Sequence, residues 1–336
     1  MLEQQLEAVH FALNWQQQLS EAFTAVEELC KYLQLNPGDL PISPTADKQF
    51  QMRVPLSFAA SMEKGNISDP LLRQVLPIAD ELTDYLGFNT DPVGDIKAAV
   101  QPGLLHKYQG RVLLINSGSC AINCRYCFRR NFPYHELQLT KREENGVIEY
   151  IKSDPTITEV ILSGGDPLLL SDSRLAQLIR QLEAINHIKR IRIHSRLPIV
   201  LPARITEELV NILAGSGKQT VLVVHANHAN EINGRVKTAF SMLKNKGITL
   251  FNQSVLLKGV NDDAATLCYL SEQLFANGVI PYYLHLLDKA TGTGHFEVSE
   301  TEAKSLMQQV LNQLPGYLVP KLVKEVAGME FKQAVY

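Results

Sequence analysis

Long apolar runs are missing from this 336-residue chain, and no stretch reaches the roughly 18 apolar residues of a membrane span. The amino terminus lacks the basic head and apolar body of a signal peptide. Charge of one sign is not in excess either, since 32 basic and 35 acidic side chains give a formal net charge of −3. A nucleic-acid-binding protein normally carries a basic excess or stripe. The composition predicts a soluble cytoplasmic enzyme that binds neither nucleic acid nor membrane.

Cysteine is scarce. The chain contains five cysteines, namely Cys30, Cys120, Cys124, Cys127 and Cys268. An odd and sparse set does not suit the disulfide framework of a secreted protein. Three of the five fall within eight residues, which favours a reducing compartment and a metal or redox site.

The chain divides into two parts with different residue patterns. Residues 1–105 look helical and rich in loops, with apolar residues spaced by three and four in 19–33 and 69–86. Beyond them, short aliphatic runs predict strands at 112–116, 159–163, 190–194, 220–225, 248–256 and 279–286. Amphipathic segments predict helices at 142–152, 171–185, 205–214, 233–246, 261–277 and 299–312. Several of these helices begin with N-cap residues, namely Ser171, Thr206, Asn261 and Ser299.

Six strand–helix units predict parallel strands joined by right-handed crossovers. An open doubly wound sheet fits this count, but polar and glycine residues follow nearly every run, as the site of an α/β barrel requires. We therefore expect an α/β fold, an incomplete (β/α)6 barrel over 106–312. A helical extension precedes it (1–105) and a short C-terminal segment follows it (313–336).

The sharpest motif comes directly after the first predicted barrel strand and reads Cys120-Ala-Ile-Asn-Cys124-Arg-Tyr-Cys127. Three thiolates on a short loop can each bind one iron of a cubane, which leaves the fourth iron open to a substrate. An electron-transfer cluster would need a fourth cysteine, and none lies nearby in sequence. Inert buried thiols on one helix face are an alternative. A zinc site is another, although structural zinc normally takes four ligands.

With its surroundings, this motif resembles the radical-SAM superfamily, and the fuller string at 120–130 resembles the lysine 2,3-aminomutase family. Supporting strings lie at 106–111, 163–168, 195–205, 252–257 and 259–261. The resemblance implies a [4Fe–4S] cluster, S-adenosyl-L-methionine and pyridoxal 5′-phosphate, which together move the α-amino group of lysine to its β-carbon. The shortness of the chain suggests the branch whose β-lysine modifies elongation factor P.

The resemblance also assigns residues to the two cofactors. Cys120, Cys124 and Cys127 would hold the cluster. Gly164, Gly165 and Asp166, which end the second strand, would hold the amino group of S-adenosylmethionine, although a simple turn is the alternative. His225 and Gln253 lie at later strand ends and could contact the nucleoside or the cofactor, or could be satisfied buried polar residues. Tyr108 and Arg111 match residues that hold the phosphate of pyridoxal phosphate, but an ordinary surface arginine fits as well without the resemblance.

Substrate recognition is implied in the same way. Arg129 lies two residues after Cys127 and matches the arginine that binds the carboxylate of lysine, a role that suits a planar guanidinium. Asp288 matches one of two acids that bind the side-chain ammonium. The second acid is expected just before a Pro-Gly turn, where this chain has Asn312 and Gln313. Its absence predicts weak binding of free lysine.

Lys321 is expected to form the Schiff base with pyridoxal phosphate. In the family a glycine run commonly precedes this lysine, and here Gly316 alone stands before it. Lys324 is the rival position. The expected partners are free lysine, an electron donor such as flavodoxin or ferredoxin, and the ligase that attaches β-lysine to elongation factor P.

Other functions are consistent with the same sequence. A 2,3-aminomutase could act on lysine or another amino acid in catabolism or biosynthesis. A radical-SAM enzyme could work without pyridoxal phosphate. A non-catalytic iron–sulfur or zinc protein is the third possibility.

The motif yields a first prediction. Anaerobic reconstitution should load about four irons per chain, and Cys124→Ala should lose both the cubane and cleavage of S-adenosylmethionine, because no spare ligand lies nearby in the sequence. Iron and sulfide analysis measures the first outcome, and release of 5′-deoxyadenosine the second. A Cys124→Ala protein with a full cubane and activity would show that the ligands are assigned incorrectly.

Overall fold

A computed structural model describes residues 2–336, with side-chain burial from residue 7 onward. One ten-stranded sheet runs in sequence order from β1 to β10. Its strands are β1 (Ala99–Gln101), β2 (Leu104–Tyr108), β3 (Arg111–Ser117), β4 (Glu159–Gly164), β5 (Arg190–Ser195), β6 (Gln219–Val224), β7 (Thr249–Val255), β8 (Val279–His285), β9 (Lys321–Lys324) and β10 (Gln333–Ala334).

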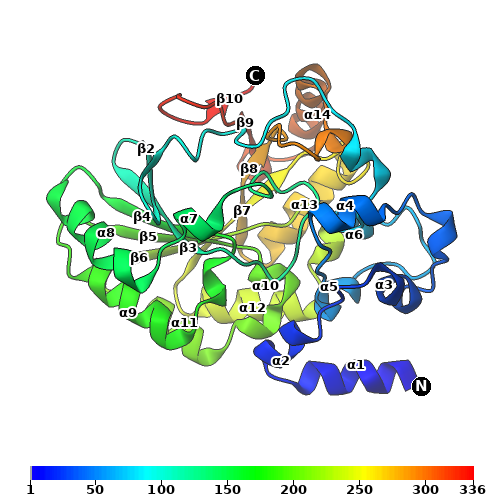
Figure 1. The fold of residues 1–336 in the computed structure, drawn as a ribbon, viewed down its shortest axis with the longest axis horizontal. Helices are drawn as coiled ribbons and strands as arrows, with labels where there is room; N and C mark the ends of the chain where they lie inside the picture. The colour runs from blue at the N-terminus through cyan, green and yellow to red at the C-terminus, as the bar shows by residue number, and fades with distance from the viewer. Residues whose placement is uncertain (1) are drawn as a thin grey trace.

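The central strands, β3 to β9, are all parallel. At one edge β1, β2 and β3 form an antiparallel meander, and at the other β9 pairs antiparallel with β10. Among the described residues no ladder joins β10 to β1, so the curved sheet stays open as a partial barrel (Figure 1). Sequential strand order is that of a barrel and excludes the doubly wound alternative, in which the order reverses at a switch point. The six predicted units are confirmed.

Helices follow the parallel strands and pack on the outside of the sheet (Figure 1). They are α8 (Lys141–Ser153), α9 (Asp172–Glu183), α11 (Glu207–Ala214), α12 (Gly234–Asn245), α13 (Ala264–Ala276) and α14 (Glu300–Gln313). In α9, for example, Leu175, Leu178 and Leu182 are buried at spacings of three and four, which turns one apolar stripe onto the sheet.

Three of the four predicted N-caps are confirmed. The side chains of Ser171, Thr206 and Ser299 each accept a hydrogen bond from a first-turn backbone N–H. Asn261 is not a cap, because α13 begins after Asp263, whose carboxylate accepts from the N–H of Thr266. The Asn261 side chain instead accepts from the N–H of Leu257 and so stabilises the loop that leaves β7.

The N-terminal part is less helical than its apolar spacing predicts. Segment 19–33 is split between α2 (Trp15–Ser20) and α3 (Val26–Tyr32), because Phe23 between them pairs with Val54 in a β-bridge. Segment 69–86 forms only α6 (Pro70–Arg73) and the 3-10 turn η2 (Ala79–Leu82), and Pro77 lies between the two. Residues 99–105 join the sheet. The other short helices are α1 (Leu2–Ala12), α4 (Pro44–Gln49), α5 (Leu56–Ala59), α7 (Tyr134–Leu137) and α10 (Leu197–Val200).

One large hydrophobic core joins the N-terminal segment to the barrel helices. It includes Leu29 and Phe58 from the N-terminal segment, and Leu162 and Ile193 from the sheet. The N-terminal segment is therefore packed against the barrel as part of the same core. Within the described residues, no helix has both the length and the apolar character needed to cross a membrane.

Candidate functional site

A cavity of about 560 Å³ lies inside the partial barrel and is lined from β2 around to β8 and by the C-terminal segment. This volume is typical of small-molecule sites. Arg111 begins β3, whereas the cysteine loop follows its end, and both line the cavity. Seven residues of strand at about 3.3 Å each span roughly 23 Å, so the cavity runs along the barrel and offers space for more than one ligand.

The cysteine loop contributes three free thiols, Cys120, Cys124 and Cys127, to the cavity wall. Burial raises the pKa of Cys127 to about 11. Across residues 2–336 no three His, Cys, Asp or Glu side chains converge on one metal-ion position. A single zinc ion needs its ligands at one point, whereas the cysteines of a cubane bind different irons. This donor set therefore fits a cluster better than zinc.

The N-terminal segment holds the cysteine loop in place. Arg125 is fully buried, and its guanidinium donates to both carboxylate oxygens of Glu81, at 2.8 and 2.5 Å. Arg130 reaches the same carboxylate at 2.8 Å. The N–H of Asn123 donates to the carbonyl of Arg53 at 3.0 Å. These contacts make the loop geometry dependent on residues outside the barrel.

Gly164 and Gly165 allow the end of β4 to touch the cysteine loop. Gly164 has φ +118°, and a Cβ there would meet the carbonyl oxygen of Ser117. A Cβ on Gly165 would overlap the backbone of Ser119, immediately before Cys120. Close packing of β4 against the cysteine loop therefore requires glycine at both positions. Both glycines also line the cavity, where their backbone is open to a ligand.

Asp166 lines the cavity, but protein donors occupy its carboxylate. The carboxylate accepts from the Ser195 hydroxyl at 2.8 Å and from the N–H groups of Arg196 and Leu168 at 2.8 and 3.0 Å. Burial raises its pKa to about 6, while the Ser195 hydrogen bond acts in the opposite direction. Asp166 therefore joins the end of β4 to the end of β5.

His225 and Gln253 meet at the cavity wall, where their Nε2 atoms lie 3.0 Å apart. Burial lowers the pKa of His225 to about 3, so the imidazole is neutral at physiological pH. At the far end of the cavity the Arg111 guanidinium lies 4.6 Å from the centre of the Tyr108 ring. These four predicted residues all line the same cavity.

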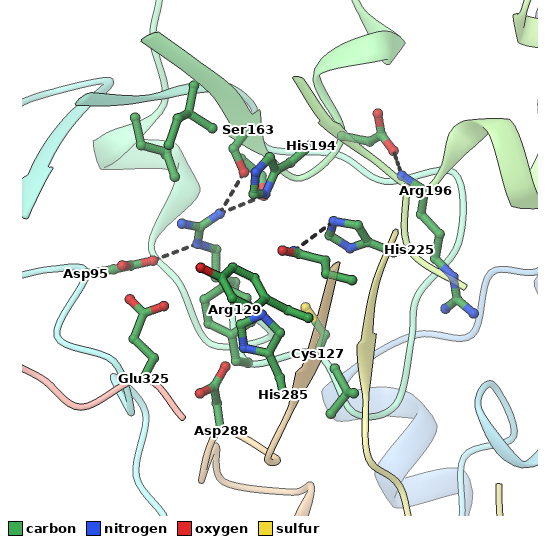
Figure 2. A pocket seen from close by; sticks show the side chains of 18 of the residues that line it. Asp95, Cys127, Arg129, Ser163, His194, Arg196, His225, His285, Asp288 and Glu325 are labelled. Atoms are coloured by element: carbon green, nitrogen blue, oxygen red, sulfur yellow. Dashed lines mark hydrogen bonds and ion pairs between the residues drawn. The ribbon is translucent and has the colours of Figure 1, made fainter. Parts of the chain in front are cut away.

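Arg129 is almost fully buried, at 8% exposure. Its Nε donates to Asp95 at 2.7 Å, and its Nη1 donates to the Ser163 hydroxyl at 3.2 Å (Figure 2). Desolvation would lower its pKa, but the Asp95 charge outweighs this effect, and the net pKa lies above the ordinary value. Asp95 was not predicted as a site residue, since it lies in a loop with no recognisable motif.

Two carboxylates, Asp288 and Glu325, line one side of the cavity together (Figure 2). Burial, together with the negative charge of Glu325, raises the pKa of Asp288 to about 7. Glu325 stays ionised because its two lysine neighbours, Lys332 and Lys107, hold its pKa below the ordinary value against desolvation. The sequence predicts no second acid near Asp288, and the structure places the carboxylate of Glu325, from the C-terminal segment, beside it.

The C-terminal segment places a lysine in the cavity that differs from the two predicted from the sequence. Lys321 is exposed at the start of β9 and does not line the cavity, while Lys324 pairs with Glu300 at 2.7 Å. Lys332 lines the cavity, with its Nζ 2.5 Å from Glu325. A turn at Gly328 (φ +82°) brings it back to the barrel. Gly328 was the available signal, since it precedes Lys332 by four residues, much as Gly316 precedes Lys321.

The fold and the cysteine-lined cavity define a radical SAM enzyme, and the Radical SAM superfamily profile matches residues 115–267. Such an enzyme uses a [4Fe–4S] cluster and S-adenosyl-L-methionine. The L-lysine 2,3-aminomutase of Escherichia coli (strain K12) is 52% identical over 316 residues, covering 94% of this chain and 92% of that protein. The Haemophilus influenzae enzyme of the same name is 48% identical over 315 residues, covering 94% and 93%. The chain belongs to the L-lysine 2,3-aminomutase family and is an isomerase.

A longer relative has the same name. The L-lysine 2,3-aminomutase of Acetoanaerobium sticklandii is 35% identical over 316 residues, which cover 94% of this chain but 76% of that protein. The similarity therefore spans nearly the whole of this chain.

The close contact at Gly165 predicts a cost for any side chain there. Gly165→Ala should lower the free energy of unfolding by about 1–3 kcal/mol, because the Ser119 backbone must move. It should also lower iron loading, since Ser119 adjoins Cys120. Denaturant unfolding of the metal-free protein and iron analysis after reconstitution measure the two effects. Gly234→Ala is the matched control, with nothing within 4 Å of its Cβ. Equal behaviour of both variants would refute the packing argument.

Proposed function

We propose that this radical SAM aminomutase converts free L-lysine to β-lysine with the help of pyridoxal phosphate, and that the product modifies elongation factor P. The observation that supports this most strongly is one cavity lined by the cysteine loop, an arginine suited to binding a carboxylate, two carboxylates and the half-buried Lys332. Each of these groups matches one chemical part of the reaction.

Cys120, Cys124 and Cys127 would hold the cluster, and the backbone at Gly164 and Gly165 would receive the amino group of S-adenosylmethionine. Asp166 would have a structural role, because its carboxylate already accepts hydrogen bonds from the Ser195 hydroxyl and the Arg196 N–H at the end of β5. His225 and Gln253 would contact the nucleoside or the cofactor ring from the wall.

Lys332, rather than Lys321, would attach pyridoxal phosphate covalently. The cavity fits this cofactor, because it offers an amine at Lys332 and a cation at Arg111, beside Tyr108, for the phosphate. Bound together, the cluster with S-adenosylmethionine would supply a hydrogen-abstracting radical, and pyridoxal phosphate a conjugated ring that spreads the unpaired electron. The protein would position the reacting atoms and exclude water.

Lysine would lie with its carboxylate at Arg129 and its side-chain ammonium at Asp288 and Glu325. Arg129 is fixed through Nε and Nη1, whereas its Nη2 makes no hydrogen bond within the described residues. A lysine residue within a protein has no free carboxylate for Arg129 to bind, so free lysine is the expected substrate.

The role in elongation factor P modification is proposed because this chain is more similar to the Escherichia coli enzyme, at 52% identity, than to the Acetoanaerobium sticklandii enzyme, at 35%. The enzyme would then act in the cytoplasm, with a flavodoxin- or ferredoxin-type donor and the ligase that attaches β-lysine. A 2,3-aminomutase serving catabolism or biosynthesis is the competing function. Deletion of the gene separates them: loss of β-lysine from elongation factor P supports the first, and an unchanged factor refutes it.

Lys332 is tested by covalent trapping. Borohydride reduction of the holoenzyme followed by peptide mapping should label Lys332, and Lys332→Ala should lose the visible band of the bound cofactor while keeping its iron. Lys321→Ala and Lys324→Ala serve as controls and should keep the band. A label on either control lysine would overturn the assignment.

Substrate binding should depend on the protonation of Asp288. Its raised pKa of about 7 means that the carboxylate is neutral below this pH and charged above it. Glu325 raises this pKa, Lys332 and Lys107 lower it, and cofactor attachment would remove the Lys332 charge. We therefore expect kcat/KM for lysine to fall roughly tenfold per pH unit well below pH 7.

Asp288→Asn should abolish this pH dependence and weaken lysine binding by about 1–3 kcal/mol, through loss of a charge-assisted hydrogen bond. Steady-state assays from pH 6 upward, with free lysine and with lysylated elongation factor P, measure both effects. A pH profile that persists in Asp288→Asn would contradict the role of this residue. Turnover of the protein-bound lysine alone would contradict the choice of free lysine.

A further inference from the structure

Arg196, the residue after β5, sends its guanidinium to the cysteine loop. Its Nη1 donates to Cys124 Sγ at 2.6 Å. Its Nη2 donates to Gln74 Oε1 at 2.7 Å and to Glu231 Oε2 at 3.0 Å. The side chain is 7% exposed and forms an ion pair with Glu231, and Figure 2 shows Arg196 at the edge of the cavity.

The surroundings hold this cation in one position. The rings of Phe58 and Tyr126 lie 5.2 and 5.5 Å from the guanidinium carbon, and the backbone N–H of Arg196 donates to Asp166. Glu231 is fixed as well, since its carboxylate accepts from the N–H groups of Asn227 and His228 at 2.9 and 3.1 Å. A fixed positive charge therefore lies against one sulfur of the loop, and a fixed negative charge lies directly behind it.

We propose that Arg196 raises the reduction potential of the cluster and that Glu231 limits this effect. The proposal rests on the cysteines as cluster ligands. One-electron reduction by an external low-potential donor makes the cluster one unit more negative. A buried N–H donor and positive charge at a ligand sulfur stabilise the reduced form, and a nearby carboxylate destabilises it. Arg196 supplies neither the electron nor a proton. It acts only by holding a positive charge and a hydrogen-bond donor at the Cys124 sulfur.

The test is the midpoint potential of the anaerobically reconstituted full-length enzyme, followed by electron paramagnetic resonance without S-adenosylmethionine. Arg196→Met should shift the potential to more negative values, and Glu231→Gln should shift it to more positive values. Arg196→Lys keeps the charge and should give a smaller negative shift. Shifts of opposite sign in the two variants would show that charge sets the potential. General damage to the site would not reverse the direction of the shift with the sign of the removed charge.

Arg192→Met is the matched control, because Arg192 lines the same cavity but pairs with Glu159 at 2.6 Å and, within residues 2–336, makes no hydrogen bond to a cysteine. It should leave the potential close to that of the wild type. Unchanged potentials in the Arg196 and Glu231 variants, or shifts of the same sign, would overturn the proposal while the cluster assignment stands. If Arg196→Met does not fold, the sign of the Glu231→Gln shift decides. A wild-type protein without a cluster would refute the underlying assignment instead.

Discussion

Charges buried inside the barrel need partners, and this constraint ties distant segments of the chain to one cavity. Arg129 pairs with Asp95 of the N-terminal segment, and Glu325 of the C-terminal segment pairs with Lys107 of β2. An unpaired buried charge costs several kcal/mol, so neither terminal segment can leave without disrupting the site. The N-terminal segment also supplies Glu81, which receives both Arg125 and Arg130 of the cysteine loop. The catalytic cavity is therefore a property of the whole chain rather than of the barrel alone.

Local signals explain why much of the fold was predictable. Strand β6 is an aliphatic run buried on both faces, β5 alternates between buried and half-buried residues, and helices such as α9 carry an apolar stripe. The cysteine loop was equally visible, because its three ligands lie close together in sequence. By contrast, apolar spacing alone predicted long helices in the N-terminal segment, where Pro77 and a bridge at Phe23 keep the elements short.

Non-local contacts explain what the sequence did not reveal. Asp95 becomes part of the site only because Arg129 and Lys107 meet it across the cavity mouth. Lys332 reaches the cavity through a turn with left-handed backbone at Gly328. Glu325 lies beside Asp288 because the C-terminal segment packs along the cavity. The register of a short terminal segment is set by such packing. Spacing along the sequence pointed to Lys321, which does not line the cavity.

We propose that one cavity holds lysine between a guanidinium and two carboxylates and presents Lys332 to the cofactor. The most direct measurement is an anaerobic crystal structure of the reconstituted enzyme with S-adenosylmethionine, pyridoxal phosphate and lysine. We expect the lysine carboxylate on Arg129 and its side-chain ammonium between Asp288 and Glu325, with Lys332 beside the cofactor aldehyde carbon. Lysine bound in the reverse direction, or a cofactor attached at Lys321 outside this cavity, would contradict this proposal.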